Sequence, residues 1–354
     1  PLSLRSPPSP LNLSLSKIPT MEWVRGEVIG RGSFSTVNIA TTSCFDQIAV
    51  KSADVADAAL LRHEKHVLDS LGHHQNIVRC LGEDIRTENC RRRYNLLIEY
   101  AEGGTLADQM KKFNGGKIPE NQVRSYARQM LKGLSHMHKM GFAHLDIKPT
   151  NLLLSQLGEV KIADFGFAER IGANSRRKGE FRGTPMYMAP ESVNYNVYGL
   201  SCDVWAVGCS VLELTTGRPA WSRIGDDEHN LVSLLLRIGV GEEAPGIPEY
   251  VSGELRDFLR RCFVKDPATR WTVDMLLNHP FVSDAEKGET EEKCGRGSWS
   301  PRYVADFPDE WSVSDISSET TELPATDFGG RLVELLAVDV GFDWVESGSW
   351  ISVR

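Results

Sequence analysis

Four side chains in and after the segment HLDIKPTN have the chemistry that phosphoryl transfer requires. Asp146, Lys148 and Asn151 lie within six consecutive positions, and Asp164 follows in the segment ADFG. Phosphoryl transfer needs an aligned acceptor hydroxyl and a neutralised phosphate charge. Asp146 is suited to accept a hydrogen bond from that hydroxyl and Lys148 to stabilise the γ-phosphate, whereas Asn151 and Asp164 offer oxygen ligands for Mg²⁺, a hard cation. For any one acidic residue alone, an ordinary turn or helix cap is the alternative.

A glycine-rich segment, IGRGSFSTV, is a candidate site for nucleotide phosphates. Glycines let backbone amides approach phosphate oxygens where a Cβ would clash. Because STVNIATT continues as a strand and not as a helix, the segment predicts a flap between two strands. A plain hairpin turn is the alternative. The candidate nucleotide-binding residues of this flap are Ile29, Gly30, Arg31, Gly32, Ser33, Phe34 and Val37.

Lys51 ends the strand-like run IAVK and could meet the α- and β-phosphates of a nucleotide. Glu64 lies thirteen residues later in a predicted helix and could hold Lys51 in place through an ion pair. Ala49, in the same strand, is a further candidate for nucleotide contact. A solvated lysine at a strand end would be the better interpretation if Lys51 stood alone. Its place after the glycine-rich flap favours the functional interpretation.

The elements that position these residues fall into a β-rich part and a helical part. Short runs rich in Val, Ile and Thr predict strands from Trp23 to about Lys51, and NIVRCLGED and YNLLIEYAE predict two more. AALLRHEKHVLDSLG has its leucines at helical spacing. After GGTL, helices are predicted in QVRSYARQMLKGLSHMHKMG, SCDVWAVGCSVLELTTG, HNLVSLLLRIGV, ELRDFLRRCFV and TVDMLLNHPFV, and a β-hairpin in NLLLSQLGEVKIADFG. A β lobe joined to a helical lobe predicts a cleft at the junction.

The order of the motifs resembles that of the eukaryotic protein kinases. IGRGSFSTV, AVK, HLDIKPTN, DFG and GTPMYMAPE occur in the family's order, between about Glu22 and Val282. Lys148 and Thr184 are similar to the serine/threonine branch. The resemblance implies an α+β fold with two lobes, a small antiparallel β lobe with one helix and a larger, mainly helical lobe. It also implies ATP and Mg²⁺ as cofactors, with Asp146, Lys148 and Lys51 as catalytic residues.

The resemblance assigns further residues. Glu99 to Ala101 look like the hinge that hydrogen-bonds adenine, and Ile98 like the side chain at the back of that pocket. Leu153 joins the expected ATP-binding residues, and Asn151 and Asp164 are the expected metal ligands. In the family, the residues equivalent to Glu191 and Arg270 form a buried ion pair, and Asp203 of SCDVWAVGC braces the catalytic loop through its backbone. Trp205 and Gly208 fit the same helix.

A finer resemblance is to the mitogen-activated protein (MAP) kinase kinase kinases, in particular the plant MEKK-type group with short N-termini. It is carried by WVRGEVIGRGSFSTVNIA, AVKSA, IEYAEGGTL, TGRPAWS, LLNHPFV and, in the tail, SWSPRYVADFPDEW. The resemblance implies that the protein substrate is a MAP kinase kinase, phosphorylated on Ser or Thr.

Two positions depart from the common kinase pattern. Ser35 replaces the third glycine of the flap, which should stiffen the loop slightly. Leu145 stands where many kinases have an arginine that pairs with a phosphorylated activation loop. We therefore expect the loop between Asp164 and Glu191 not to need phosphorylation. Its one hydroxyl residue before Thr184 is Ser175.

Two alternatives compete with an active protein kinase. A pseudokinase scaffold would bind nucleotide or partner proteins without phosphoryl transfer, but such proteins usually lack the strand lysine, the catalytic aspartate or the DFG aspartate, and Lys51, Asp146 and Asp164 are all present. A small-molecule kinase of related fold is disfavoured by GTPMYMAPE, which in the family shapes a shelf for peptides.

Composition excludes several other classes of protein. The chain has 354 residues, 41% of them hydrophobic, and no run approaches the length of a membrane span. Its seven cysteines lack any C-x-x-C pair, which favours reduced thiols in a cytoplasmic or nuclear protein. Residues 283–354 carry 16 acidic and 6 basic side chains, so this tail contributes −10 to the net charge of −8 and the rest +2. No nucleic-acid-binding charge is present.

These observations predict three regions. Residues 1–21, rich in Pro and Ser, are expected to be a disordered extension. Residues 22–282 form the expected kinase domain. Residues 283–354 are expected to be a largely disordered, acidic regulatory tail, in which the amphipathic run at residues 331–345 could dock on a partner or on the kinase domain. An unimportant chain end is the alternative for this tail.

Overall fold

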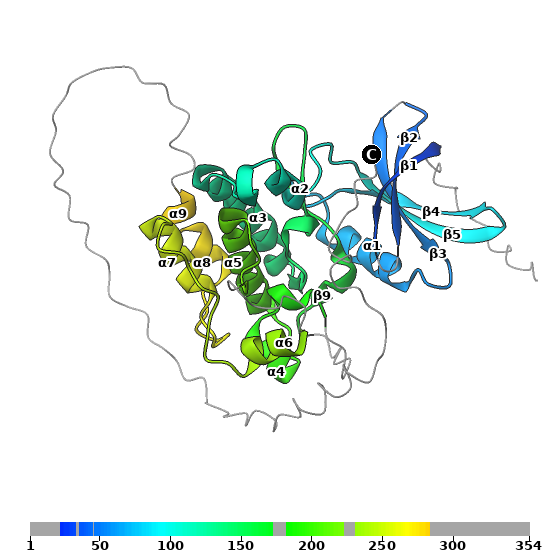
Figure 1. Ribbon diagram of the computed structural model, residues 1–354. Helices are drawn as coiled ribbons and strands as arrows, with labels where there is room; N and C mark the ends of the chain where they lie inside the picture. Colours follow the sequence, from blue (N-terminus) through cyan, green and yellow to red (C-terminus); the bar gives the residue numbers. More distant parts are fainter. Residues whose placement is uncertain (1–21, 33–34, 45, 173–181, 223–230, 284–354) are drawn as a thin grey trace, which may run out of the picture. The chain divides into compact units, whose positions relative to one another are not determined.

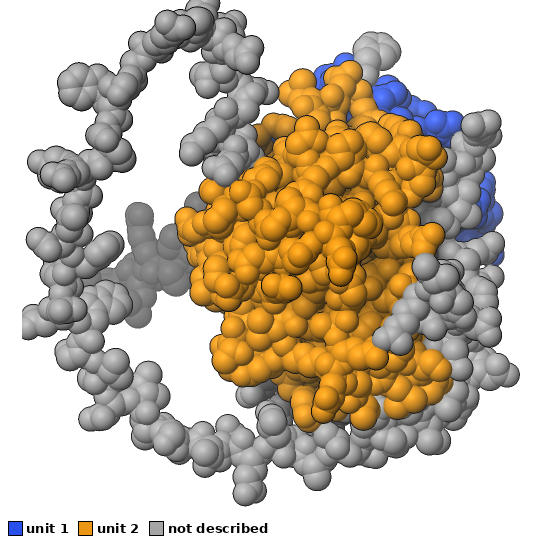
Figure 2. Space-filling view, turned by 60° about the vertical axis from the view of Figure 1, so that its left-hand side comes forward, with its two compact units in different colours: residues 1–69, 79–100, 344–354 blue, residues 70–78, 101–343 orange. Residues whose placement is uncertain are grey.

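The computed structural model describes residues 22–32, 35–44, 46–172, 182–222 and 231–283. The chain divides into two compact units (Figure 2). The described part of unit 1 comprises residues 22–69 and 79–100, and that of unit 2 comprises residues 70–78 and 101–283, with the gaps given above. Within these described residues, no helix is both long enough and apolar enough to cross a membrane.

Unit 1 is built on a five-stranded sheet in which all neighbouring strands are antiparallel (Figure 1). The strand order is β1-β2-β3-β5-β4. The β-branched residues of these segments favour their extended form, and β3 and β5, in the middle of the sheet order, are buried over most of their length. The elements are β1 Trp23–Arg31, β2 Thr36–Thr42, β3 Gln47–Asp54, α1 Ala59–Leu71, β4 Cys80–Glu88 and β5 Arg91–Glu99.

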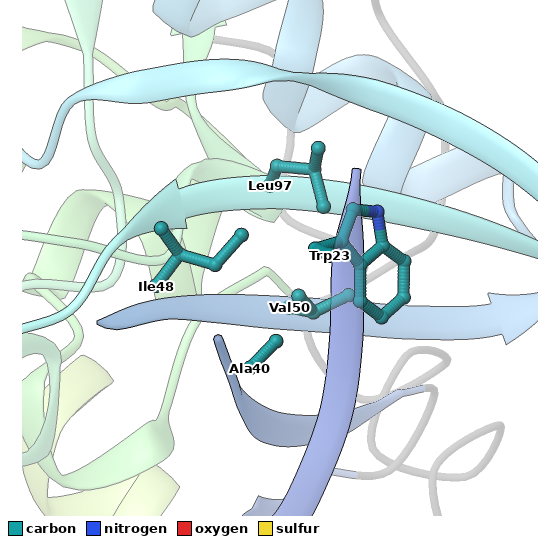
Figure 3. Close-up of a cluster of buried hydrophobic side chains, with 5 residues drawn as sticks. All are labelled: Trp23, Ala40, Ile48, Val50 and Leu97. Atoms are coloured by element: carbon teal, nitrogen blue, oxygen red, sulfur yellow. The ribbon is translucent and has the colours of Figure 1, made fainter. Parts of the chain in front are cut away.

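One face of this sheet carries an apolar cluster over which an indole lies (Figure 3). Trp23 of β1 packs with Ala40, Ile48, Val50 and Leu97 from strands β2, β3 and β5, and all five side chains are buried. Because four strands contribute to it, this cluster fixes their register, and a slip of one residue would turn its members to the opposite face.

Unit 2 is mainly helical. Its long helices are α3 Glu120–Lys139 and α5 Leu200–Thr216, and its shorter ones are α2 Leu106–Lys111, α4 Pro190–Tyr195, α6 Leu231–Gly239, α7 Gly253–Cys262, α8 Val273–Leu277 and α9 Pro280–Ser283. Helix α5 is buried at every residue from Cys202 to Leu212, and it packs against α3 and α7. A helix without a polar face belongs in the centre of a domain, where α5 lies.

Two small antiparallel ribbons complete unit 2. Strand β6 Phe142–Ala143 pairs with β9 Glu169–Arg170, and β7 Leu152–Leu154 pairs with β8 Val160–Ile162. Gly158, in the turn between β7 and β8, has φ +80°, a conformation that favours glycine. The predicted β-hairpin is therefore confirmed.

Two predicted elements differ from the structure. The strand expected from Asn76 begins instead at Cys80, because the preceding backbone turns to β8: the N–H of Val78 donates to the carbonyl of Ile162, and the N–H of Ile162 donates to that of Asn76. The last predicted helix is divided into α8 and α9, since Pro280 cannot continue an existing helix but is suited to begin a new one.

Candidate active site

Lys51 and Glu64 form a buried ion pair in unit 1. The Nζ of Lys51 lies 2.6 Å from Oε2 of Glu64, and the two side chains are 5% and 1% exposed. Lys51 comes from the middle of β3, between Val37 of β2 and Leu96 of β5, and Glu64 comes from α1. The predicted ion pair is confirmed, and the interpretation of Lys51 as a solvated strand end is wrong. The charge of Glu64 offsets the cost of burying an ammonium group.

The face of the sheet that carries Lys51 also carries three apolar residues of the expected nucleotide site, Val37, Ala49 and Ile98. Val37 is the register partner of Lys51, and Ala49, two positions before Lys51, is the partner of Ile98. Residues directly paired or two apart point to the same side of a sheet. These three side chains are buried at 3–5% exposure.

The glycine-rich segment lies between two antiparallel strands, as its sequence predicts. Gly30 pairs with Val37 across β1 and β2, and the N–H of Gly32 donates to the carbonyl of Ser35 at 2.8 Å. Ile29 and Arg31 lie in β1. The candidates Ser33 and Phe34 are outside the described residues.

At the end of β5, Glu99 is held by Arg79. The N–H of Glu99 donates to the Arg79 carbonyl at 3.0 Å, and its side-chain Oε1 accepts from the Arg79 N–H at 2.6 Å. These two bonds hold the main chain at the position where the hinge is expected. Ala101, which belongs to unit 2, is buried, and its carbonyl accepts from the N–H of Gly104 at 3.2 Å.

The loop that contains Asp146 is fixed through its backbone by Asp203 of α5. The Asp203 carboxylate accepts hydrogen bonds from the N–H groups of His144 and Leu145, each at 2.8 Å, and also contacts Nε2 of His138 at 2.8 Å. Leu145 has φ +66°, which is unusual for a residue with a branched side chain. The predicted brace is confirmed, and it stabilises a strained residue directly before Asp146.

His144 is a fully buried part of the same loop. Burial lowers the pKa of His144, while Asp203 raises it in part. Its Nδ1 lies 3.3 Å from the Asp146 N–H and its Nε2 lies 3.1 Å from the Ala163 carbonyl, so one neutral tautomer satisfies both contacts. The ring also packs edge-on against Phe165 with 5.0 Å between centroids. His144 thus joins the loop of Asp146 to the backbone directly before Asp164.

Asp146 is the centre of a hydrogen-bonded cluster in unit 2. Its Oδ1 accepts from the N–H and the hydroxyl of Thr184 at 2.9 and 2.8 Å, and its Oδ2 accepts from Nδ2 of Asn151 at 2.8 Å. The Nζ of Lys148 lies 3.1 Å from Asp146 Oδ2 and donates to the hydroxyl of Thr184 at 2.6 Å. Asp146 is only 4% exposed. The structure therefore brings together three predicted residues, together with Thr184, which sequence reasoning used only as a marker of the serine/threonine branch.

Asn151 and Asp164 have the donor atoms that Mg²⁺ prefers. The Nδ2 of Asn151 donates to the carbonyl and to Oδ2 of Asp146, which leaves Oδ1 as the atom suited to a cation. The Asn151 carbonyl accepts from the N–H of Ala163 at 2.9 Å, so the residue before Asp164 is held against Asn151. An amide oxygen and a carboxylate fit a hard divalent cation.

Glu191 and Arg270 form the second predicted ion pair. Both oxygens of Glu191 accept from the guanidinium, at 2.6 and 2.9 Å, and the side chains are 4% and 0% exposed. Arg270 also donates to the carbonyls of Ser201, Val264 and Lys265. Such a bidentate pair ties the segment that follows Thr184 to the body of unit 2.

The remaining predicted residues are placed as follows. Leu153 lies in β7, half-buried, in a bridge with Thr105. Gly208 packs tightly in α5, since a Cβ there would lie 2.6 Å from the Cβ of Cys262. Ser175 is outside the described residues. Sequence reasoning missed Gly183, which lies against the Leu145 carbonyl, and Arg182, which pairs with Glu169 of β9. The glycine in the motif GTP was the one available signal.

Comparison with known proteins agrees with this architecture. The family model described as the protein kinase domain matches residues 23–282 of the sequence. The chain is 48% identical to mitogen-activated protein kinase kinase kinase 20 of Arabidopsis thaliana, across 94% of this chain and 100% of that protein. It is 38% identical to mitogen-activated protein kinase kinase kinase 17 of the same plant, across 94% of this chain and 93% of the relative. Kinase kinase kinase 18 is also 38% identical, across 94% and 99% of the two chains.

A β-sheet unit with a buried lysine–glutamate pair, and a helical unit with an aspartate–lysine–threonine cluster, are the two components of a protein kinase. The chain belongs to the protein kinase family, and within it to the plant MEKK-type mitogen-activated protein kinase kinase kinases. It is a serine/threonine protein kinase, and this family generally uses ATP and Mg²⁺.

Proposed function

We propose that this kinase transfers the γ-phosphoryl group of Mg-ATP to Ser or Thr hydroxyls of MAP kinase kinases, with Asp146 as the residue that orients the acceptor hydroxyl. The cluster of Asp146, Thr184 and Lys148 is the observation that carries this proposal. A carboxylate has about four lone-pair positions. The N–H and hydroxyl of Thr184, Nδ2 of Asn151 and Nζ of Lys148 contact these positions in this structure, so a substrate hydroxyl would bind Asp146 by replacing one of the four contacts.

We propose that Lys148 is the cation that stabilises the transferred phosphoryl group. Its Nζ is held by Asp146 and Thr184 with 14% of the side chain exposed, so it is oriented and not fully enclosed. A preorganised cation stabilises developing charge without having to reorganise during the reaction. We assign Lys148 this role, and Thr184 the role of orienting both Lys148 and Asp146.

Asn151 and Asp164 are the residues that would hold Mg²⁺, as their oxygen donors indicate. When bound, the metal neutralises phosphate charge and orients the phosphates. Lys51, held by Glu64, would bind the α- and β-phosphates. Val37, Ala49 and Ile98 would border the adenine, with Glu99 and Ala101 as its hydrogen-bonding hinge. The rest of the proposed ATP-binding residues are Ile29, Gly30, Arg31, Gly32, Ser33, Phe34 and Leu153.

The substrate class comes from the relatives. Proteins named mitogen-activated protein kinase kinase kinase match this chain over nearly their whole length. Their name states that they act on MAP kinase kinases. We propose the same substrate class here.

A radioactive phosphate-transfer assay tests the assignment. The purified full chain would be incubated with labelled Mg-ATP and a catalytically inactive MAP kinase kinase, beside Lys51→Met and Asp146→Asn variants. Lys65→Met is the matched control, because Lys65 also belongs to the β-sheet unit and is paired with an acidic residue, Asp69, but lies outside the Lys51–Glu64 pair at 22% side-chain exposure. We expect both site variants to lose at least about a hundredfold in kcat and the control to keep wild-type activity.

The outcomes separate the alternatives. Label on Ser or Thr of the MAP kinase kinase that disappears in both site variants supports the proposal. Nucleotide binding without transfer in the wild-type protein would instead indicate a pseudokinase, and transfer only to small metabolites would indicate a small-molecule kinase. If Lys51 and Asp146 serve the same transfer step, the double variant should lose much less kcat than the product of the two single losses.

Three finer proposals concern the ends of the chain and its location. We propose that residues 283–354, of which the structure describes Ser283 alone, form an acidic tail on which a regulator docks, and that residues 1–21 are an extension outside the kinase domain of residues 22–282. The tail's charge of −10 supports a basic docking partner. Cytoplasmic or nuclear location is proposed from the unpaired cysteine pattern. Comparing regulator capture by the full chain and by a chain ending at Ser283 tests the tail.

A further inference from the structure

Arg182, two residues before Thr184, makes three contacts with Glu169 and Tyr198. Its guanidinium forms an ion pair with Oε2 of Glu169 in β9, with side-chain exposures of 12% and 18%. Its backbone N–H donates to the hydroxyl of Tyr198 at 3.0 Å, and its guanidinium carbon lies 5.4 Å from the centroid of the same ring. Nothing in the mechanism proposed above uses these contacts.

The residues that hold Arg182 lie directly beside the catalytic loop. Glu169 is the register partner of Ala143 in β6, and the chain continues from Ala143 through His144 and Leu145 to Asp146. Two residues after Arg182, Thr184 makes its two hydrogen bonds to Asp146. The segment 182–184 is therefore attached to the segment 143–146 directly at Thr184 and, through Glu169, at Arg182.

Gly183, between the two attachments, allows this close approach. It has φ +92°, and a Cβ at this position would overlap the carbonyl oxygen of Leu145. With the centre of the segment in contact with the loop, a movement of Arg182 is passed to Thr184 over a single residue. The position of the Thr184 hydroxyl, and with it those of Asp146 and Lys148, thus depends on where Arg182 is held.

We propose that the Arg182–Glu169 ion pair is a positioning contact for catalysis, which holds the segment 182–184 so that Thr184 orients Asp146 and Lys148. The inference rests on the function proposed above and adds a residue pair to it. It also explains how the loop is held with Leu145 in place of an arginine. Here the cation is Arg182 of the loop itself, and the anion is Glu169 of the unit's framework.

The charges and burial of the pair make it a contact of substantial strength. A charge-assisted bond between a guanidinium and a carboxylate is stronger than a neutral hydrogen bond, and partial burial reduces its screening. Loss of one partner leaves the other charge enclosed and unpaired, which costs more than loss of both. A reversed pair, with the same two charges exchanged, keeps the attraction.

The test is a charge-swap cycle in the full-length kinase. Arg182→Glu, Glu169→Arg and the double variant would be assayed for kcat, for the KM of ATP and for melting temperature. We expect each single variant to lose about tenfold or more in kcat with the KM of ATP changed by less than about twofold, and the double variant to regain at least half of the loss on a logarithmic scale. Arg170→Gln is the matched control, since Arg170 is the next residue of β9 and is exposed.

Two results would overturn the inference. One is an unchanged kcat in the single variants. The other is a double variant whose loss in kcat equals the product of the two single losses. Either result means that the ion pair does not position the site. Melting temperatures separate a role in catalysis from one in folding alone, because the latter would lower kcat only in proportion to the folded fraction. If Asp146→Asn remained active in the same assay, the proposed function would fail instead, whatever the charge-swap cycle shows.

Discussion

The carboxylate of Asp203 and the backbone N–H of Leu145, 58 residues apart in the sequence, form a buried hydrogen bond of 2.8 Å. The same carboxylate accepts from the N–H of His144 at 2.8 Å. Asp203 is fully buried in the central helix α5, so it connects the most enclosed element of unit 2 to the loop of Asp146. This connection is the reason that Leu145 can keep a left-handed backbone conformation.

Replacement of Asp203 should therefore damage both stability and activity. Asp203→Ala leaves two buried N–H groups without an acceptor, and each such loss costs about 1–3 kcal/mol. We expect the free energy of unfolding to fall by about 2–6 kcal/mol, with a smaller loss in Asp203→Asn, which retains one acceptor oxygen. Urea unfolding followed by fluorescence measures both. Equal stability of wild type and Asp203→Ala would refute the brace.

Gly183→Ala should lower kcat, because an alanine Cβ would overlap the Leu145 carbonyl and the backbone has φ +92°. Strain of this kind costs about 1–3 kcal/mol, and relief would move Thr184 away from Asp146. We expect a fall in kcat of about tenfold or more. Gly253→Ala is the control, since Gly253 begins α7 with open space around its Cβ position. A Gly183→Ala enzyme as active as this control would show that close approach to Leu145 is unnecessary.

The Glu191–Arg270 pair should be far more important for stability than an exposed ion pair. Glu191→Gln leaves the fully buried guanidinium of Arg270 without its counter-charge, a change that costs about 3–5 kcal/mol. Asp69→Asn removes the partner of Lys65 at the surface, where the expected loss is below about 1 kcal/mol. Chemical denaturation of the two variants gives the comparison. Losses of similar size would contradict the structure's assignment of one pair to the interior.

Stability should fall on acidification because of His144. Burial lowers the pKa of this imidazole below its ordinary value of 6.5, so between the two values the unfolded chain binds a proton that the folded chain does not. The stabilising contribution is complete above pH 6.5 and decreases as the pH falls below it. In His144→Gln, the free energy of unfolding should fall less steeply on acidification, by up to about 1.4 kcal/mol per pH unit.

Unfolding measured at several pH values between 5 and 7.5, on the order of one per half unit, tests this expectation. His74, whose pKa is lowered by burial and then by His136, is present in both proteins and cancels in the difference. Parallel curves for wild type and His144→Gln would exclude His144 as a source of the pH dependence.

Ser175→Ala should keep full kinase activity. Ser175 is outside the described residues, and the expectation rests on Leu145, which offers no cation to a phosphoserine. We expect kcat within about twofold of wild type for enzyme produced without any other kinase. Abolished activity in a folded Ser175→Ala protein would show that loop phosphorylation is required after all.

Some of the site could be predicted because its signals are local. The strand period identified the segments of β1, β2, β3 and β5, and the run AALLRHEKHVLDSLG identified α1. The order of Lys51, Asp146 and Asp164 was readable without coordinates because each sits in a short motif with its own turn or strand. The Lys51–Glu64 pair was also predictable, since a buried lysine on a strand requires a nearby anion.

Other features depend on contacts between distant segments. Asn76 to Arg79 look extended and apolar enough for a strand of the first sheet, but Val78 pairs with Ile162 instead. Likewise, no spacing in the sequence connects Arg182 with Glu169, because both are charged residues of the kind usually found in solvated loops. The hydrogen bonds of Thr184 to Asp146, 38 positions apart, were equally invisible.

The sequence by itself determined the chemistry and the family, because residue types within a motif and the periods of strands and helices are properties of neighbouring positions. Only the tertiary structure decided that Arg182 pairs with Glu169, that Thr184 binds Asp146, and that Leu145 has a left-handed backbone conformation beside Asp146. Those outcomes depend on burial, which sets the cost of leaving a charge or an N–H group unpaired, and burial exists only once segments far apart in the chain have packed together.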